Sequence, residues 1–401
     1  MFRRNNMKKT ISIIGGGPSS FLLAAFLDTD KFDITIYEKN KTAGRKFLVA
    51  GKGGFNLSHS EPISELTKRY TPIDFLKNSL VHFTNEDFKD WLNVLEIPTY
   101  IGSSKRVYPK QGIKPITVLS TILNHLKKKG IIFKYEHTFS GWDSKNNLII
   151  NDAIISSDFT VFSLGGGSWK ITGSDGSWLE TFQKKGIPTI PFEASNCAFK
   201  IDWKSEFIEK NEGDPLKNIT ISCAEKTQKG EAVITRFGLE GNAIYGLSPL
   251  IRAQLKSEKK ATIYIDFKPT LTLENITSKI ENSNFKNRTQ ILKKELKLSN
   301  SQIELLKIHL SKKVYLDAHL ISKKIKNFPL KITDISLLDG AISTVGGVDL
   351  NAIDTHFQLH TLPNQFCIGE MLNWDAPTGG YLIQACASNG VFLSNYLNKI
   401  D

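Results

Sequence analysis

Apolar positions at the start of the chain predict a strand, a tight turn and a helix. Residues 10–14 form an apolar run, and residues 19–27 carry apolar side chains at helical spacing. The intervening GGGPSS places Gly15 where a tight turn is needed. Gly17 has no Cβ, so a ligand can approach the helix N-terminus closely, where free N–H groups favour negative charge. The pattern predicts a βαβ unit that binds a dinucleotide.

A second apolar run, ITIYE, ends at Glu38 and supports this prediction. A carboxylate about twenty residues after the turn can accept hydrogen bonds from both ribose hydroxyls. It would repel a 2′-phosphate, which argues against NADP as the ligand. Ser20 replaces the third glycine of the pattern and is small enough for close helix–strand packing. The alternative is a glycine turn in an ordinary βαβ unit.

Further periodic segments extend this unit. A helix is expected over residues 85–95, with Thr84 and Asp87 as a capping box, and another over 115–130, between a proline and a glycine. Residues 131–150 alternate as a β-hairpin or meander. The first part of the chain is therefore expected to be of α/β class.

The pattern changes after residue 190. Short β-rich segments predict a small barrel or sandwich, and Lys/Leu-rich helices follow. Glycine and β-branched residues then return, and a final helix is expected from about Gly380. An insertion thus separates two parts of one nucleotide-binding domain. The expected parts are residues 1–190, 191–270, 271–332 and 333–401.

Residues 44–59, GRKFLVAGKGGFNLSH, form a glycine-rich loop directly after the second strand. Such a loop is expected to lie with its backbone against a flat or anionic ligand. Arg45 and Lys46 are candidates to neutralise a phosphate, or a flavin edge that gains negative charge on reduction. Asn56 is a candidate to hydrogen-bond the ring edge. The alternative is a flexible surface loop.

A second glycine cluster, LGGGSWKITGSDGSW at residues 164–178, follows a buried strand and allows backbone to approach a cofactor. Ser174, Asp175 and Gly176 are interpreted as the cap of the next helix, so Asp175 is expected to be an N-cap rather than a catalyst.

The last motif is IGEMLNWDAPTGGYLIQACASNG, residues 368–390. Glu370 ends a strand, where a carboxylate can bind the chain that links a flavin ring to its phosphates. Thr378 and the two glycines after it open the final helix, whose N–H groups would stabilise negative charge on a reduced flavin. Trp374 and Asp375 are candidates to line the substrate side, with simple loop packing as the alternative for Trp374.

Composition narrows the class of protein. The 401 residues are 40% hydrophobic and 23% charged, and no apolar stretch approaches the roughly 20 residues that span a bilayer. The N-terminal residues lead into the first strand without an apolar signal region, which predicts a cytoplasmic protein. The cysteines are scattered, which argues against a disulfide framework, a metal site and a redox dithiol. They are Cys197, Cys223, Cys367 and Cys386.

The net charge is +12, and the densest basic cluster lies at residues 284–326. A solvated helical face is the preferred interpretation, with an anionic partner as the alternative.

Taken in order, these motifs resemble the bacterial BaiN-like family of FAD-dependent oxidoreductases, also described as aminoacetone-oxidase-like flavoproteins. The resemblance covers nearly the whole chain. It implies FAD as the cofactor, in a split Rossmann-like domain with an inserted small β domain and a helical domain. The predicted cofactor-binding residues are Gly15, Gly17, Pro18, Ser19, Glu38, Lys39, Arg45, Lys46, Gly53, Asn56, Thr138, Phe139, Gly165, Gly369, Glu370, Thr378, Gly379, Gly380 and Tyr381.

Three departures from the family pattern indicate a divergent subfamily. Gly54 and Phe55 stand where Arg-Cys is common, and Ala376 stands where glycine is common. Leu382 and Ile383 follow Tyr381 where the family often has Asn-Leu. These positions adjoin the expected ring and substrate, so they affect substrate identity more than FAD binding.

The predicted reaction is hydride transfer between flavin N5 and an unidentified small molecule. It would be a reduction of an activated C=C or C=O bond, or an amine oxidation. A single glycine fingerprint predicts no dedicated NAD(P)H domain, although NAD(P)H remains a candidate transient donor. The alternatives are a flavin-dependent RNA-modifying enzyme, which is disfavoured, and a non-enzymatic redox sensor. His59, Tyr108 and Tyr245 are weak acid–base candidates, each expected to be structural.

Overall fold

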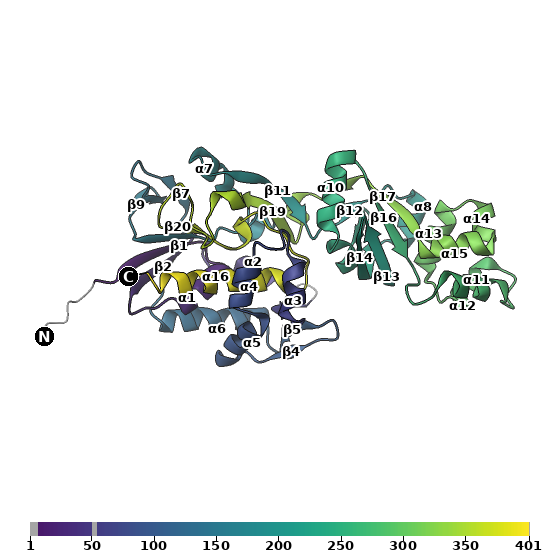
Figure 1. Ribbon diagram of the computed structural model, residues 1–401, viewed down its shortest axis with the longest axis horizontal. Coiled ribbons are helices and arrows are strands. Elements are labelled where there is room, and N and C mark those ends of the chain that lie inside the picture. The colour runs from purple at the N-terminus through teal and green to yellow at the C-terminus, as the bar shows by residue number, and fades with distance from the viewer. Residues whose placement is uncertain (1–6, 50–53, 401) are drawn as a thin grey trace. The chain divides into compact units, whose positions relative to one another are not determined.

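The computed structural model describes residues 7–49 and 54–400, which form two compact units (Figure 1). The first comprises residues up to Glu193 and from Ile342 onward. The second comprises Ala194–Ala341. Each unit contains its own large hydrophobic cluster.

A five-stranded parallel sheet forms the centre of the first unit, in the order β20–β10–β1–β2–β6. Ile13 of β1 lies between Ile36 of β2 and Val161 of β10, and all three side chains are buried. Near-continuous apolar strands of this kind are typical of parallel sheets covered on both faces. The strands are β1 (Lys9–Ile14), β2 (Phe32–Glu38), β6 (Ile132–Tyr135), β10 (Phe159–Phe162) and β20 (Gln365–Cys367).

Helices α1 and α16 pack closely in this unit, and Figure 1 shows the yellow α16 running alongside α1. A Cβ on Gly390 of α16 would lie 2.5 Å from the carbonyl oxygen of Ser19, so this glycine permits the close approach. The helices of the unit are α1 (Pro18–Phe26), α2 (Arg45–Val49), α3 (Ile63–Leu66), α4 (Lys77–His82), α5 (Asn85–Val94), α6 (Pro115–Lys128), α7 (Trp178–Lys184) and α16 (Tyr381–Leu397).

The first unit also contains two small antiparallel sheets, in the orders β3–β5–β4 and β7–β8–β9. A two-stranded ribbon, β11–β19, lies where the chain leaves and re-enters the unit. These strands are β3 (Ser58–His59), β4 (Thr99–Ile101), β5 (Arg106–Pro109), β7 (Phe139–Trp142), β8 (Leu148–Ile150), β9 (Ala153–Ile155), β11 (Thr189–Ser195) and β19 (Ser343–Val348).

The second unit contains a seven-stranded antiparallel sheet in the order β17–β16–β13–β14–β15–β12–β18. Its elements are β12 (Phe199–Lys200), α8 (Ser205–Asn211), β13 (Pro215–Cys223), β14 (Lys226–Ile234), β15 (Gly238–Glu240), α9 (Asn242–Tyr245), α10 (Ser248–Glu258), β16 (Ala261–Asp266), α11 (Leu273–Glu281), α12 (Arg288–Lys294), α13 (Asn300–His309), α14 (Lys312–Leu316), α15 (Ala318–Lys326), β17 (Phe328–Ile332) and β18 (Asp334–Ile335). Helical Ile251, Ile276 and Ile325 share one hydrophobic cluster with strand residues.

The α/β class and the parallel Rossmann-like sheet are confirmed. The capping box of Thr84 and Asp87 is present at the start of α5, and α6 begins at Pro115. The finer division of the insertion at residue 270 stays a prediction.

Three local predictions were wrong. Strands β7 and β8 form an antiparallel hairpin within residues 131–150 as expected, but the first strand of the expected meander, β6, joins the parallel sheet beside β2. The inserted strands form one sheet rather than a barrel or sandwich, since helices complete their hydrophobic cluster. Helix α7 has Ser177, not Asp175, at its N-cap.

Candidate functional site

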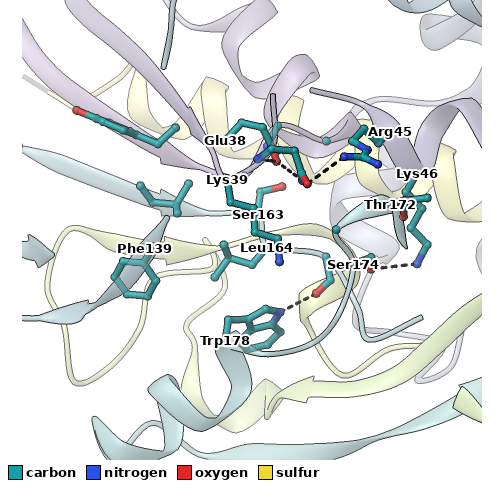
Figure 2. A pocket seen from close by; sticks show the side chains of 18 of the residues that line it. Glu38, Lys39, Arg45, Lys46, Phe139, Ser163, Leu164, Thr172, Ser174 and Trp178 are labelled. Carbon is teal, nitrogen blue, oxygen red and sulfur yellow. Dashed lines mark hydrogen bonds between the residues drawn. The ribbon is translucent and has the colours of Figure 1, made fainter. Parts of the chain in front are cut away.

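A cavity of about 400 Å³ lies at the carboxyl ends of the parallel strands (Figure 2). Figure 2 shows charged Glu38, Arg45 and Lys46 on one side of it, with aromatic Phe139 and Trp178 on another. This edge of an open parallel sheet is the usual place for a nucleotide. Predicted cofactor-binding residues that line the cavity are Gly15, Gly17, Pro18, Ser19, Glu38, Lys39, Arg45, Lys46, Thr138, Phe139, Gly165 and Glu370.

The turn between β1 and α1 has the geometry that a pyrophosphate requires. Gly15 has φ +103°, and a Cβ there would lie 2.3 Å from the carbonyl oxygen of Ser163, so only glycine fits. Gly17 is the N-cap of α1, and a Cβ on it would meet no described atom within 4 Å. No side chain among the described residues caps this helix, and its first turn has no acidic residue. The residues present therefore fit a bound dinucleotide.

Glu38 ends β2 with its carboxylate held in one orientation. Its Oε2 accepts a hydrogen bond from the Gly16 N–H at 2.8 Å. Its Oε1 accepts from the backbone N–H of Asn40 at 2.8 Å and from Asn40 Nδ2 at 2.6 Å. A carboxylate has about four acceptor positions, so these bonds leave capacity for a ribose hydroxyl.

Lys39 and Asp175 form an ion pair at the rim of the cavity, with 2.9 Å between Nζ and Oδ2. Asp175 also accepts hydrogen bonds from the N–H and hydroxyl of Ser177. Burial would raise the pKa of Asp175, but the Lys39 ammonium and these bonds outweigh it and hold the pKa below its usual value. Asp175 therefore connects two segments of the rim.

A second cavity of about 330 Å³ adjoins the first. Both are lined by Pro18, Lys46, Phe47, Glu370 and Cys386, so together they form one elongated site. At this junction the Lys46 Nζ lies 3.0 Å from Glu370 Oε2 and 3.1 Å from Oε1. It also donates to the hydroxyls of Ser168 and Ser174. The charged junction is suited to hydroxyl and phosphate groups between the two ends of a dinucleotide.

The start of α16 lines the second cavity. Gly380 is the N-cap with φ +98°, and a Cβ there would lie 2.4 Å from the Ser58 carbonyl oxygen, so a side chain cannot be accommodated. The positive end of this 17-residue helix therefore faces the cavity. Other residues lining it are Asn56, Arg106, Trp169, Thr378, Gly379, Leu382 and Ile383.

Several sequence-based candidates lie elsewhere. Gly369 packs against Ser19, whose Oγ would lie 2.4 Å from a Cβ at that position. Trp374 is buried, and its Nε1 donates to the Gly369 carbonyl at 2.8 Å, which is the packing role given as its alternative. Asp375 is also buried, and its backbone pairs with Thr71 rather than placing it along either cavity. Gly53 lies outside the described residues.

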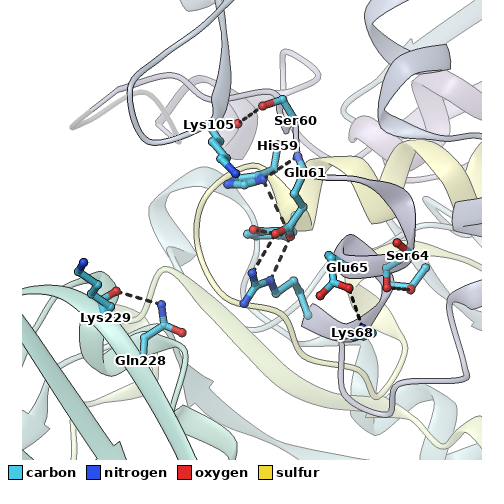
Figure 3. Close-up of polar contacts among 12 residues, drawn as sticks. His59, Ser60, Glu61, Ser64, Glu65, Lys68, Lys105, Gln228 and Lys229 are labelled. Atoms are coloured by element: carbon cyan, nitrogen blue, oxygen red, sulfur yellow. Dashed lines mark hydrogen bonds and ion pairs between the residues drawn. The ribbon is translucent and has the colours of Figure 1, made fainter. Parts of the chain in front are cut away.

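Tyr381 belongs to a polar group around the buried Glu61 that sequence analysis did not find, here called the Glu61 cluster (Glu61, Arg69, Tyr381 and His59). Figure 3 labels Glu61 and His59 of this cluster. Arg69 donates to both carboxylate oxygens of Glu61, at 3.0 and 2.8 Å, and the Tyr381 hydroxyl donates to Oε1 at 2.8 Å. The His59 ring stacks on Tyr381 with 4.9 Å between centroids. The cluster ties β3 to the first residue of α16.

Electrostatics in the Glu61 cluster explain its protonation states. Burial would raise the pKa of Glu61, but the bonds from Arg69 and Tyr381 outweigh it and lower the pKa. Burial lowers the pKa of His59, whose Nδ1 accepts from the Glu61 N–H at 3.2 Å. Burial and the hydrogen bond to Glu61 raise the pKa of Tyr381. These interactions favour a neutral His59 in a positioning role.

The other acid–base candidates have separate surroundings. Tyr108 stacks on Tyr100 with 5.6 Å between ring centroids and contacts Gly54. Tyr245 lies in the second unit, where burial raises its pKa to about 12. All four cysteines are buried and unbridged. Across residues 7–49 and 54–400, no cluster suited to a metal ion is found, and no helix is long and apolar enough to cross a bilayer.

We expect Glu61→Gln to destabilise the fold by about 1–3 kcal/mol at neutral pH. Removing one partner of a fully buried ion pair costs about 3–5 kcal/mol. The loss expected here is smaller because Arg69 is 40% exposed. The pKa of Glu61 in the folded protein is lowered, so its contribution is fully present above the ordinary pKa of a glutamate in an unfolded chain. It is lost as the pH falls through the lowered pKa of the folded state. The melting temperatures of wild type and variant should therefore become equal as the pH is lowered into the acid range.

Glu65→Gln is the matched control, because Glu65 pairs with Lys68 at the exposed surface. It should change stability by at most about 0.5 kcal/mol at any pH. If the difference in stability between wild type and Glu61→Gln stayed constant from neutral pH into acid, the lowered pKa assigned to Glu61 would be contradicted.

The fold and the elongated site define a Rossmann-type protein whose cavity at the carboxyl ends of the parallel strands suits a dinucleotide. The chain belongs to the family of the HI0933-like protein Rossmann domain, whose model matches residues 9–396. This confirms the family resemblance found from the motifs.

Two curated relatives and one solved structure illustrate the similarity. The ribosomal RNA dihydrouridine synthase of Haemophilus influenzae is 22% identical over 93% of this chain and 94% of its own. The 3-dehydro-bile acid delta(4,6)-reductase of Clostridium scindens is 23% identical over 66% of each chain. The open conformation of a flavocytochrome c3 fumarate reductase covers 98% of this chain and 78% of its own, at 12% identity and a TM-score of 0.48.

Proposed function

We propose that this protein is an FAD-dependent reductase of a C=C bond conjugated to a carbonyl group, with NAD(P)H as transient electron donor. The observation that carries the proposal is the second cavity, where the N-terminus of α16 and the Arg106 side chain are found together. Both favour negative charge, which develops on a carbonyl oxygen when its conjugated C=C bond accepts hydride. The adjoining dinucleotide cavity supports the placement of a flavin ring there.

The residues of the chain have separable tasks in this proposal. When bound, FAD supplies the hydride, which leaves from N5 of its reduced ring. The α1 N-terminus and Glu38 hold the adenosine and phosphate end, while Lys46 and Glu370 hold the linking chain. Arg106 would bind the substrate carbonyl, which would direct the hydride to the carbon β to it, and the neighbouring carbon would take a proton from water.

Both curated relatives support this bond type. A delta(4,6)-reductase of a 3-dehydro bile acid reduces a C=C bond conjugated to a ketone. Dihydrouridine forms when the C=C bond conjugated to a uracil carbonyl is reduced. A uracil base within RNA is therefore a second candidate substrate for this protein. It is favoured by the match to the Haemophilus influenzae relative, which extends over 93% of the chain.

The test uses purified holoenzyme whose flavin is photoreduced without oxygen. Mixing it with conjugated enones, uridine oligonucleotides, saturated ketones and amines should return oxidised flavin absorbance rapidly only with the first two classes. Separate mixing of oxidised enzyme with NADH, NADPH and the amines identifies the electron donor. Rapid reduction of the oxidised flavin by amines, with no response to any conjugated C=C bond, would show an oxidase and overturn the proposal.

A further inference from the structure

The small sheet β3–β5–β4 carries an aromatic and basic face that begins at the second cavity. Along β5, Arg106 and Tyr108 are partly exposed, whereas Val107 and Pro109 are buried, so the first two point to the same face. Tyr100 pairs directly with Tyr108 across the strands and therefore shares that face. We call the surface formed by Tyr100, Arg106 and Tyr108 the β4–β5 face.

The β4–β5 face runs from the interior of the site to solvent. Arg106 lines the second cavity, and its Nε lies 3.3 Å from the position of a Cβ on Gly379. Tyr108 lies against Gly54, which lines the same cavity. Tyr100 is 48% exposed and stacks on Tyr108 with an angle of 26° between the rings. A ligand that touches both Arg106 and Tyr100 must extend from the cavity onto an open surface.

The turn that joins β4 and β5 is held in place. The Gly102 N–H donates to the Arg106 carbonyl, and the Lys105 N–H donates to the Gly102 carbonyl, each at 2.9 Å. The N–H and the hydroxyl of Ser60 both donate to the Lys105 carbonyl, as Figure 3 shows for the hydroxyl. These hydrogen bonds, within the turn and from Ser60 just after β3, hold the face in one conformation. A ligand therefore does not have to order the face when it binds.

The chain segment that carries this face is basic. Residues 97–114 contain four basic side chains and no acidic one. Lys105, Lys110 and Lys114 are exposed, and Arg106 is partly exposed. Exposed aromatic rings beside basic side chains are the combination that binds single-stranded nucleic acid, by base stacking and phosphate contacts.

We propose that the β4–β5 face binds single-stranded RNA, with a nucleobase stacked on Tyr100 and the adjacent phosphates near Lys105 and Lys110. The inference rests on the proposed function and selects its second candidate substrate. The base that enters the second cavity is then the uracil to be reduced, and the stacked base is its neighbour along the strand. A single strand is long enough to extend from the second cavity onto the exposed Tyr100.

The experiment measures fluorescence anisotropy of a short fluorescein-labelled oligouridylate mixed with holoprotein at several salt concentrations. Tyr100→Ala should weaken binding by about tenfold, and Tyr100→Phe should bind like wild type, because phenylalanine keeps the ring. Lys105→Ala combined with Lys110→Ala should reduce the slope of log K against log salt by about 1.4, as expected for two lost contacts to a single strand.

Tyr264→Ala is the matched control. Tyr264 is a 39% exposed tyrosine on a strand of the second unit, so its loss should leave binding unchanged. Flavin absorbance and thermal unfolding of each variant show that the holoprotein is intact.

Three results would overturn the inference. They are no binding of the oligonucleotide by wild type, wild-type affinity in Tyr100→Ala, and a higher NADPH concentration needed for flavin reduction in Tyr100→Ala with RNA binding unchanged. The proposed function is judged separately, by reduction of small enones. Enone reduction without RNA binding overturns only the RNA inference, whereas RNA binding without reduction of any conjugated C=C bond overturns the proposed function.

Discussion

Replacing Gly17 by aspartate is expected to weaken FAD binding strongly while leaving the protein folded. A Cβ at this position meets no described atom within 4 Å, and the backbone φ of −119° suits any residue, so the apoprotein should tolerate the side chain. The new carboxylate would stand at the α1 N-terminus, where the phosphates of the cofactor are placed. We expect the dissociation constant for FAD to rise by about 100-fold or more.

FAD titration of the apoprotein, followed by flavin fluorescence, checks this expectation. Gly17→Ala adds a methyl group without charge and should cost much less affinity. Gly15→Ala is the contrasting variant, because its Cβ would collide with the Ser163 carbonyl and lower the melting temperature itself. Retention of FAD by Gly17→Asp at wild-type affinity would show that the phosphates bind elsewhere.

Arg106→Met is expected to slow hydride transfer by about 100-fold, with FAD content unchanged. The guanidinium lines the second cavity but not the first, so it should stabilise charge on the substrate carbonyl without holding the adenosine end. Single-turnover oxidation of the reduced enzyme by a saturating enone measures this step directly. Methionine retains much of the apolar volume of the side chain, which limits damage to packing.

Arg106→Lys separates charge from shape, because lysine keeps the charge but loses the planar fork. It should recover part of the rate. If Arg106→Met transferred hydride at the wild-type rate, another group would have to stabilise the carbonyl. The α16 N-terminus would then be the remaining source of positive potential in the cavity.

The sequence predicted those parts of the site that depend on local backbone geometry. Gly15, Gly17 and Glu38 follow from a strand, a turn and a helix of fixed spacing, and the Thr84 capping box requires only three residues of helix. Such features are independent of how the rest of the chain folds. The arrangement of the inserted strands was not predicted, because alternation identifies the buried face of a strand but not its neighbours.

The Glu61 cluster and the Lys46–Glu370 pair could not be predicted for the same reason. Tyr381 is 320 positions from Glu61, and Glu370 is 324 positions from Lys46. Neither pairing leaves a periodic signal in the chain. They exist because α16 packs beside α1 and returns the last segment to the first strands.

This long separation has a consequence for biosynthesis. A ribosome adds about 5–20 residues per second, so Glu370 emerges roughly 16–65 seconds after Lys46. During that interval the nascent chain contains Lys46 but not Glu370, so the elongated site is incomplete. FAD is therefore expected to bind only after translation is complete. Cells starved of riboflavin, from which FAD is made, should accumulate the full-length apoprotein rather than incomplete chains.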